Sequence, residues 1–189
     1  VIKSGRRKRW SWSTRLRLVL AGWRPNRDVW ERLTLPAGLA PFAAARDVLR
    51  EFGGLRLGSD NEHMWLDPAL GEKVADQVRE FAARLGTALY PLGYIKHQDE
   101  EYLIIDERGC VYLLTGGGKL GWAELEPQAS TFDRAIEYFV QLGIRGRLKY
   151  GKVKWDDLRA NGLADKQWSL GGSQAATTGP GGGGGNDRS

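Results

Sequence analysis

Two short runs of β-branched, aromatic and aliphatic residues dominate the hydrophobic pattern of the chain. They extend from Tyr102 to Ile105 and from Cys110 to Leu114, and Asp106-Glu107-Arg108-Gly109 separates them. A four-residue connection that starts with Asp and ends with Gly is typical of a type I turn closed by a left-handed glycine. The pattern therefore predicts a β-hairpin. Both strands are apolar enough to lie in the middle of a sheet that helices cover on at least one face.

Apolar residues recur at helical spacing in three longer segments, each followed by a glycine. These segments are residues 41–52, 72–85 and 130–142. Such a one-sided apolar face predicts an amphipathic helix, and Ser130 is the expected N-cap of the third. The other expected elements are shorter, with helices at residues 14–20, capped by Thr14, and 155–159, and strands at residues 55–57, 64–66 and 119–122.

Composition changes at both ends of this pattern. Residues 1–13 form a basic leader that we expect to be disordered. Residues 14–148 hold the major elements and predict a single domain. Residues 149–170 form a charged extension, and residues 171–189 form a glycine-rich tail that buries too little surface to fold.

The formal net charge of +5 belongs to the ends of the chain. Between Trp23 and Gly143, 19 Asp and Glu residues oppose 13 Lys and Arg residues, so this part carries a net charge of −6. The leader carries Arg6-Arg7-Lys8-Arg9, with Trp10 and Trp12 close behind. Basic residues interleaved with aromatic ones bind phosphates and stack on bases, so an alternative function is a nucleic-acid-binding accessory protein. The acidic body would repel the same phosphates, which disfavours this alternative.

Five acidic residues flank the predicted hairpin. They are Asp99, Glu100 and Glu101 before the first strand and Asp106 and Glu107 in the turn. A charge run of this kind is commonly a solvated surface. The other interpretation is an acidic surface that speeds encounter with a basic protein partner and disfavours wrong partners.

No residue pattern indicates catalysis, a metal or a cofactor. The single cysteine, Cys110, excludes a disulfide framework, favours a cytoplasmic setting and is expected to be a buried, inert thiol. Together with His63 and His97 it lacks the paired spacing of a zinc site. A hydrolase that used His97 and nearby carboxylates would need a cleft with perturbed pKa values, which a sequence does not reveal. No apolar run approaches the roughly 20 residues of a membrane helix.

Two glycine clusters and two tryptophans have structural interpretations. Gly53-Gly54 follows a helix and residues 116–118 lead into a strand, whereas a phosphate-binding loop precedes a helix. Both clusters are therefore expected to be turns.

Trp23 and Trp65 are each either core residues or binding anchors, and we favour the core.

Five short motifs, in order along the chain, resemble the SUKH immunity proteins, specifically the third SUKH group. They are Ala21-Gly22-Trp23-Arg24-Pro25, Leu49-Arg50-Glu51-Phe52-Gly53-Gly54-Leu55, Asp67-Pro68 before a helix, Leu89-Tyr90-Pro91-Leu92-Gly93, and Ile105-Asp106-Glu107-Arg108-Gly109-Cys110-Val111-Tyr112. The resemblance covers about residues 21–146, and leaves the leader, the extension and the tail outside the family pattern. Within it, the positions that we expect to be mainly structural are Trp23, Phe52, Gly53, Gly54, Leu55, Tyr90, Pro91, Gly93, Gly109, Val111 and Tyr112.

This resemblance implies both a fold and a function. The implied fold is α+β, with a central, mainly antiparallel sheet flanked by helices. The implied function is that of a bacterial immunity protein, which binds and neutralises the C-terminal domain of a cognate polymorphic toxin, often a nuclease or a nucleic-acid deaminase, inside the producing cell. No enzymatic activity, cofactor or small-molecule substrate comes with the family. The acidic residues near the hairpin would then contact the toxin.

Overall fold

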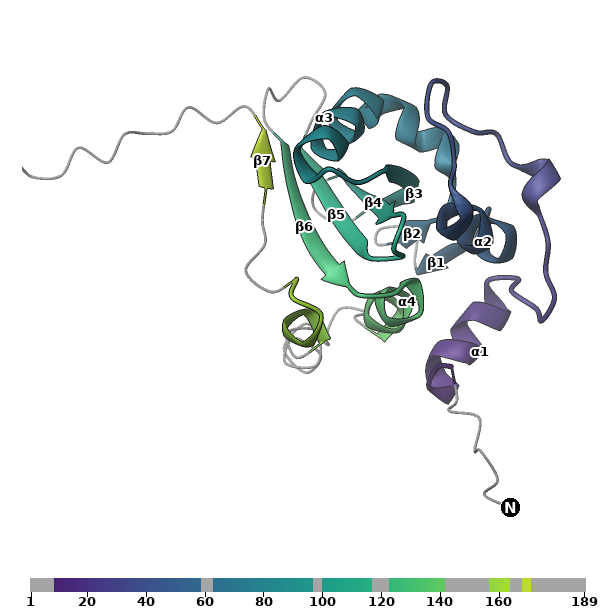
Figure 1. Cartoon of the computed structure of the whole chain (residues 1–189). Helices are drawn as coiled ribbons and strands as arrows, with labels where there is room; N and C mark the ends of the chain where they lie inside the picture. The colour runs from purple at the N-terminus through teal and green to yellow at the C-terminus, as the bar shows by residue number, and fades with distance from the viewer. Residues whose placement is uncertain are drawn as a thin grey trace, which may run out of the picture.

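The computed structural model describes residues 9–58, 63–96, 100–116, 123–141, 157–163 and 168–170, without the side chains of residues 100 and 168–170. Within these ranges seven strands form one antiparallel sheet in the order β1-β2-β3-β4-β5-β6-β7 (Figure 1). Each strand thus pairs with its neighbours in the sequence, and the sheet is a meander. Together with the flanking helices this confirms the expected α+β class.

The elements have the following bounds. The strands are β1 (Arg56–Gly58), β2 (His63–Trp65), β3 (Leu89–Lys96), β4 (Glu100–Asp106), β5 (Val111–Gly116), β6 (Ala123–Ala129) and β7 (Trp168–Leu170). The α-helices are α1 (Trp12–Leu20), α2 (Ala43–Phe52), α3 (Ala75–Leu85) and α4 (Phe132–Gln141), and the 3-10 helices are η1 (Trp30–Arg32) and η2 (Pro68–Val74).

The predicted hairpin is confirmed as β4 and β5. Leu103 lies opposite Leu113 and Ile105 lies opposite Val111. The turn closes where the N–H of Gly109 donates to the carbonyl of Asp106 at 2.9 Å, and Gly109 has a φ of +90°. A glycine adopts this left-handed conformation without the steric cost that a Cβ would bring.

Helices cover both faces of the hairpin strands, because side chains alternate between the faces along a strand. Helices α2 and α4 pack on one face and α3 packs on the other (Figure 1). The first face carries Leu103, Ile105, Val111 and Leu113, and the second carries Tyr102, Ile104, Tyr112 and Leu114. All eight side chains are buried, which explains why the sequence of these strands does not alternate between polar and apolar residues.

Two strands differ from the expected pattern. Strand β3 is absent from the expected strands, and two of its residues, Pro91 and Gly93, are poor strand residues. The structure accommodates them with a register shift in the pairing with β4 between these two residues. Strand β6 is also absent from the expected strands, and it contains Pro127, which lies next to the register shift between β5 and β6. The strand expected at residues 119–122 lies outside the described residues.

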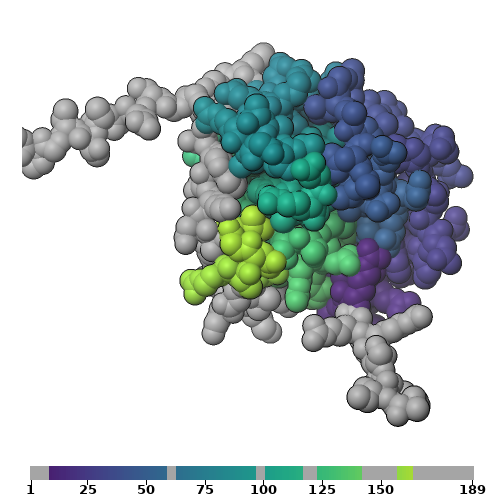
Figure 2. All heavy atoms as spheres, in the orientation of Figure 1, coloured from purple at the N-terminus to yellow at the C-terminus, as the bar shows by residue number. Residues whose placement is uncertain are grey.

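Two helix starts also differ from expectation. The segment expected as a helix from residue 72 is a 3-10 helix up to Val74, and α3 begins at Ala75. The expected cap Ser130 instead donates its hydroxyl to Asp157, and the hydroxyl of Thr131 accepts from the N–H of Arg134 at 3.3 Å. Figure 2 shows residues 157–163 lying against the segment that contains β6 and α4, so the C-terminal part of the chain helps to hold this turn.

The packed body begins earlier than residue 14. Ser11, and not Thr14, caps α1, since its hydroxyl accepts from the N–H of Thr14 at 3.3 Å. The Trp10 side chain is buried, edge-on to the rings of Trp23 and Phe52. The expectation of disorder is therefore wrong for residues 9–13. Residues 1–8, 149–156 and 171–189 lie outside the described residues.

Candidate functional site

The residues weighed for metal or nucleophile chemistry do not come together. Within the described ranges no group of three or more His, Cys, Asp and Glu side chains could hold a metal ion. His63 lies in β2, Cys110 is half-buried after the hairpin turn, and His97 lies outside the described residues. Burial, followed by the neighbouring Asp106, raises the pKa of the Cys110 thiol, which disfavours the reactive thiolate. In the same ranges, every helix is too short or too polar to cross a membrane.

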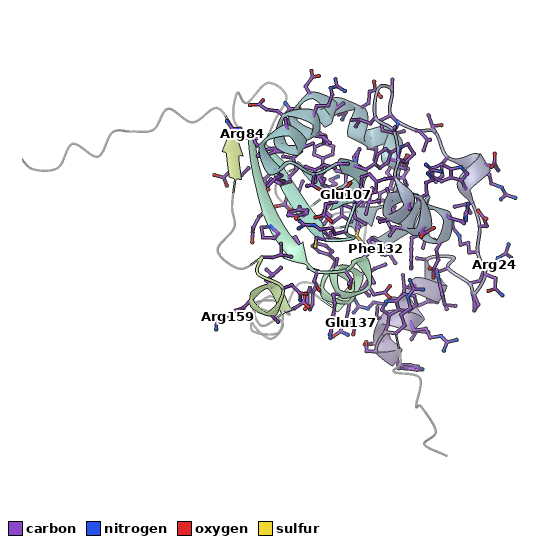
Figure 3. The ribbon with its side chains drawn as sticks, in the orientation of Figure 1. Arg24, Arg84, Glu107, Phe132, Glu137 and Arg159 are labelled. Carbon is purple, nitrogen blue, oxygen red and sulfur yellow. The ribbon has the colours of Figure 1, made fainter. Side chains whose placement is uncertain are left out.

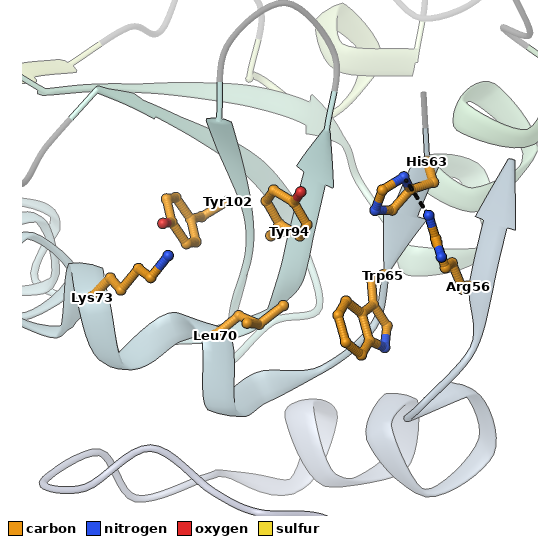
Figure 4. A pocket seen from close by; sticks show the side chains of 7 residues that line it. All are labelled: Arg56, His63, Trp65, Leu70, Lys73, Tyr94 and Tyr102. Carbon is orange, nitrogen blue, oxygen red and sulfur yellow. Dashed lines mark hydrogen bonds between the residues drawn. The ribbon is translucent and has the colours of Figure 1, made fainter. Parts of the chain in front are cut away.

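The surface has a hollow of about 240 Å³ between the sheet and η2 (Figure 4). A row of paired residues forms its floor. Arg56 lies opposite Trp65, Trp65 lies opposite Tyr94, and Tyr94 lies opposite Tyr102. Because directly opposite residues point to the same face of a sheet, the row crosses the four strands β1 to β4 on one face.

Rings and one aliphatic side chain line most of this hollow. The Tyr94 ring lies 5.8 Å from the His63 ring and 6.3 Å from the Tyr102 ring, centroid to centroid. Leu70 of η2 forms the facing wall. The Trp65 side chain is 37% exposed, so Trp65 is a surface residue, whereas Trp23 is buried as expected.

Among the described residues, the lining of the hollow also includes two cationic side chains and no carboxylate. They are Arg56, whose Nη2 lies 3.3 Å from Nδ1 of His63, and Lys73 of η2. Figure 4 places them at opposite ends: Lys73 lies beside Tyr102 at one end, and Arg56 lies beside His63 at the other. The described lining of the hollow thus contains two cations, although the central part of the chain has an excess of acidic residues. Sequence reasoning missed this site, and the spacing of its residues along the chain offers no signal for it.

The five acidic residues proposed for toxin contact do not form one surface. Asp99 lies outside the described residues, and Glu100 begins β4. Glu101 is half-buried near the same end of β4, whereas Glu107 is exposed at the turn beyond the other end (Figure 3). At about 3.3 Å per residue, close to 20 Å of chain separates Glu101 from Glu107. Their role in toxin binding stays a prediction.

Asp106 does not belong to the surface at all. Its side chain is fully buried and accepts hydrogen bonds from the N–H groups of Arg108 and Cys110, at 2.9 and 2.8 Å. The hydroxyl of Tyr112 and the guanidinium of Arg108 bind its other oxygen, at 3.0 and 2.8 Å. Burial, and next the Asp106 charge, raise the pKa of Tyr112. These contacts hold the turn together and give Asp106 a structural role.

A different acidic group arises from strand pairing. Glu101 and Glu124 both lie opposite Thr115, from the strands on either side of it, so they share one face of the sheet. Glu126, two residues further along β6, points to the same face and is exposed. Because the sequence did not lead us to expect strand β6, we did not expect this group of carboxylates either. The Glu-x-Glu alternation at positions 124 and 126 is the signal that could have revealed it.

The residues of the family motifs lie in the core or at turns. The indole N–H of Trp23 donates to Glu51 at 2.9 Å. A Cβ on Gly53 would lie 2.5 Å from the carbonyl oxygen of Leu49, and Gly54 has a φ of +77°. The remaining motif positions, Phe52, Leu55, Tyr90, Val111 and Tyr112, are buried, Pro91 and Gly93 lie in β3, and Gly109 lies in the hairpin turn.

The fold defines the class of protein. It is an α+β domain in which helices cover both faces of one antiparallel meander sheet. The chain matches the model of the SUKH-3 immunity protein family over residues 10–137, and it belongs to this family. The match confirms the resemblance and includes the buried Trp10. No curated protein and no solved structure matched the chain.

Proposed function

We propose that this protein binds and neutralises the C-terminal domain of a cognate bacterial polymorphic toxin in the cytoplasm, without catalysing a reaction. Membership of the SUKH-3 immunity protein family is the observation that carries this proposal. The toxin that we expect is a nuclease or a nucleic-acid deaminase.

The acidic group on the sheet supports this choice of toxin. A toxin that handles nucleic acid needs a basic face for the phosphates. Glu101, Glu124 and Glu126 place three carboxylates on one face of β4 and β6, and such a surface speeds the encounter with a basic partner. Asp99 and Glu100 directly precede Glu101 in the chain and would add to the same charge.

Co-expression with the toxin domain tests the function. We expect cells that carry both genes to survive and the two proteins to co-purify, whereas cells that carry the toxin alone die. Death of the doubly transformed cells, together with failure to co-purify, would remove the immunity function.

A paired charge reversal tests the acidic group. Glu101→Lys combined with Glu126→Lys should lower the association rate constant by about tenfold at low salt, and less at high salt, because steering is screened. Asp76→Lys combined with Glu80→Lys is the matched control, since it makes the same charge change at exposed positions of α3, on the other face of the sheet, and it should change the rate by less than about twofold. Stopped-flow fluorescence measures both. Equal rates for the double variant and the wild type would exclude this group from the encounter surface.

The structure weakens the nucleic-acid alternative. Arg9 is the last basic residue of the leader, and its guanidinium already binds Glu51 and Asp133 at 2.7 Å each. It also stacks 4.2 Å above the Trp10 ring, which is buried in the core. Neither side chain is therefore available for phosphates and bases, and we do not propose a nucleic-acid function.

A further inference from the structure

We propose that helix α1 binds the surface of an anionic lipid bilayer through a row of four exposed apolar side chains, which we call the outer stripe. The outer stripe consists of Trp12, Leu16, Val19 and Leu20. This inference does not depend on the toxin-binding function. It concerns contact with the surface of the bilayer, because a helix of nine residues is too short to cross it.

Helix α1 has a buried side and an opposite side that is apolar and exposed. Thr14 and Leu18 are 0% exposed, and Gln141 of α4 donates to the Thr14 hydroxyl at 3.1 Å, so this inner side packs on the domain. At about 100° per residue, the outer stripe occupies an arc of roughly 100° on the other side of the helix. Trp12 is 76% exposed and Leu20 is 78% exposed. Apolar side chains that gather in an exposed patch mark a binding surface for a protein or a membrane.

The part of the chain that contains the outer stripe is strongly basic. Residues 1–27 contain nine Lys and Arg residues and no Asp or Glu residue. On the helix itself, Arg15 and Arg17 are exposed, and the helical spacing places them on either side of the stripe. Glu137 belongs to α4, on the inner side of α1, where it accepts from the N–H of Ser11 at 3.2 Å. The outer stripe with its basic flanks therefore complements a negatively charged surface.

A second group of cations continues this charge beyond the end of α1. Burial, and next the charges of Arg24 and Arg32, lower the pKa of Arg27, so these three guanidinium groups lie near one another. The Arg27 guanidinium donates to the carbonyls of Glu51 and Gly53, at 2.9 and 2.7 Å, and these groups carry no charge that would neutralise it. Figure 3 shows Arg24 on the same side of the molecule as α1.

The outer stripe suits a bilayer better than a second copy of the chain or a nucleic acid. A stable protein interface takes roughly 20 to 30 residues from each partner, whereas the stripe has four. Contact between two α1 helices would also bring the arginines of both copies together, and like charges across an interface are unfavourable. A nucleic acid would gain little, because the aliphatic Leu16, Val19 and Leu20 do not stack on bases as aromatic rings do.

The chemistry of α1 matches the surface layer of an anionic bilayer. Helices that lie on membranes present Trp and Leu to the lipid and carry Lys and Arg beside them. Tryptophan favours the headgroup level, and arginine side chains extend from an apolar surface to reach the phosphates. Anionic lipids of the cytoplasmic leaflet attract basic residues near the surface. Figure 1 shows α1 at the periphery of the molecule, where a flat surface can reach it.

The test is sedimentation of the full chain with lipid vesicles. We expect binding to vesicles of equal parts phosphatidylglycerol and phosphatidylcholine, and binding weaker by about tenfold or more to phosphatidylcholine alone. Trp12→Ala combined with Leu20→Ala should weaken binding to the anionic vesicles by about tenfold or more, because it removes apolar area from the contact. The matched control is Trp65→Ala with Leu35→Ala, which makes the same changes at two positions outside α1 that are each 37% exposed. It should change the binding by less than about threefold.

A charge reversal tests the basic flanks. Arg15→Glu combined with Arg24→Glu should weaken binding to the anionic vesicles by about tenfold at low salt, and by less at high salt. Arg84→Glu with Arg159→Glu makes the same charge change on the opposite side of the molecule in Figure 3, and should change the binding by less than about threefold. Melting temperatures will confirm that each variant folds.

Three results would overturn the inference. The first is no binding of the wild-type chain to the anionic vesicles, or an equal loss in the Trp65 and Leu35 control. The second is unchanged vesicle binding by the Trp12 and Leu20 variant together with a loss of affinity for the toxin domain, which would assign the outer stripe to the toxin. The third is a wild-type dimer in analytical ultracentrifugation that the same variant dissociates, which would assign the stripe to a second copy.

Discussion

Asp106 is the residue on which the hairpin turn depends. It is fully buried, yet two backbone N–H groups, the Tyr112 hydroxyl and the Arg108 guanidinium all donate to its carboxylate. A buried carboxylate is tolerated when donors surround it in this way. The residue that the sequence suggested for partner contact therefore serves the fold.

Asp106→Ala should lower the free energy of unfolding by about 2 to 4 kcal/mol, because it leaves the Tyr112 hydroxyl and two backbone N–H groups buried without an acceptor. Urea denaturation measures this loss. Glu107→Ala, at the exposed neighbouring position, is the control and should cost less than about 0.5 kcal/mol. Similar losses for both variants would contradict the structural role.

Tyr90 makes the stability of the fold depend on pH in the alkaline range. Its hydroxyl is buried without a hydrogen-bond partner within the described residues, and burial raises the pKa of the side chain from 10.0 to about 12. Between these two values the unfolded chain loses the phenolic proton and the folded chain keeps it, so stability is complete below pH 10 and falls as the pH rises towards 12.

Tyr90→Phe should remove about 2 kcal/mol of this decline between pH 10 and pH 12, because stability falls by at most about 1.4 kcal/mol per pH unit while the unfolded chain is ionised and the folded chain is not. At neutral pH the same variant should be as stable as wild type or about 1 kcal/mol more stable, since it removes an unsatisfied hydroxyl. Guanidinium denaturation at several pH values measures both effects. A decline as steep as that of wild type would show that Tyr90 does not cause it.

At the scale of elements, close backbone contact explains the unusual strand β3. A Cβ on Gly93 would lie 2.1 Å from the carbonyl oxygen of Trp65 and 2.8 Å from Cα of Leu66. A Cβ on Gly71 of η2 would lie 2.4 Å from Cβ of Pro91. Glycines thus allow β2, η2 and β3 to approach one another, and this approach shapes one side of the hollow.

Gly93→Ala should lower the free energy of unfolding by at least about 3 kcal/mol, because the backbone atoms that the new Cβ would contact cannot move aside without disturbing β2. Gly109→Ala is the matched control, since Gly109 has a φ of +90° but no atom within 4 Å of an added Cβ. The control variant should lower the free energy of unfolding by only about 1 to 2 kcal/mol, which is the strain of an alanine in the left-handed conformation. Thermal unfolding followed by circular dichroism compares the two, and equal losses would exclude the contact as the cause.

At the scale of the whole molecule, the N-terminal residues join two helices. The Arg9 guanidinium binds Glu51 of α2 at 2.7 Å and Asp133 of α4 at 2.7 Å. Trp10 then packs against Trp23 and Phe52, with ring centroids 5.3 and 5.9 Å away. The start of the described chain thus holds together α2 and α4, the helices that cover one face of the sheet.

Trp10→Ala should lower the free energy of unfolding by about 3 to 5 kcal/mol, as is usual for a large core side chain. Trp12→Ala, two positions further on, should cost less than about 1 kcal/mol, because the Trp12 side chain is 76% exposed. Guanidinium denaturation of the two variants measures the difference. Equal losses would mean that Trp10 does not contribute to the core.

The sequence by itself determined the central hairpin, the helices α2, α3 and α4 to within a few residues, the α+β class and the family. These features depend on local periodicity, turn chemistry and short motifs, which neighbouring residues carry together. Only the tertiary structure decided that β3 and β6 are strands despite their prolines, since register shifts and glycine contacts between strands make them possible. It also buried Asp106, separated Glu101 from Glu107 and assembled the hollow from residues 56–102, because strand pairing determines which side chains share a face.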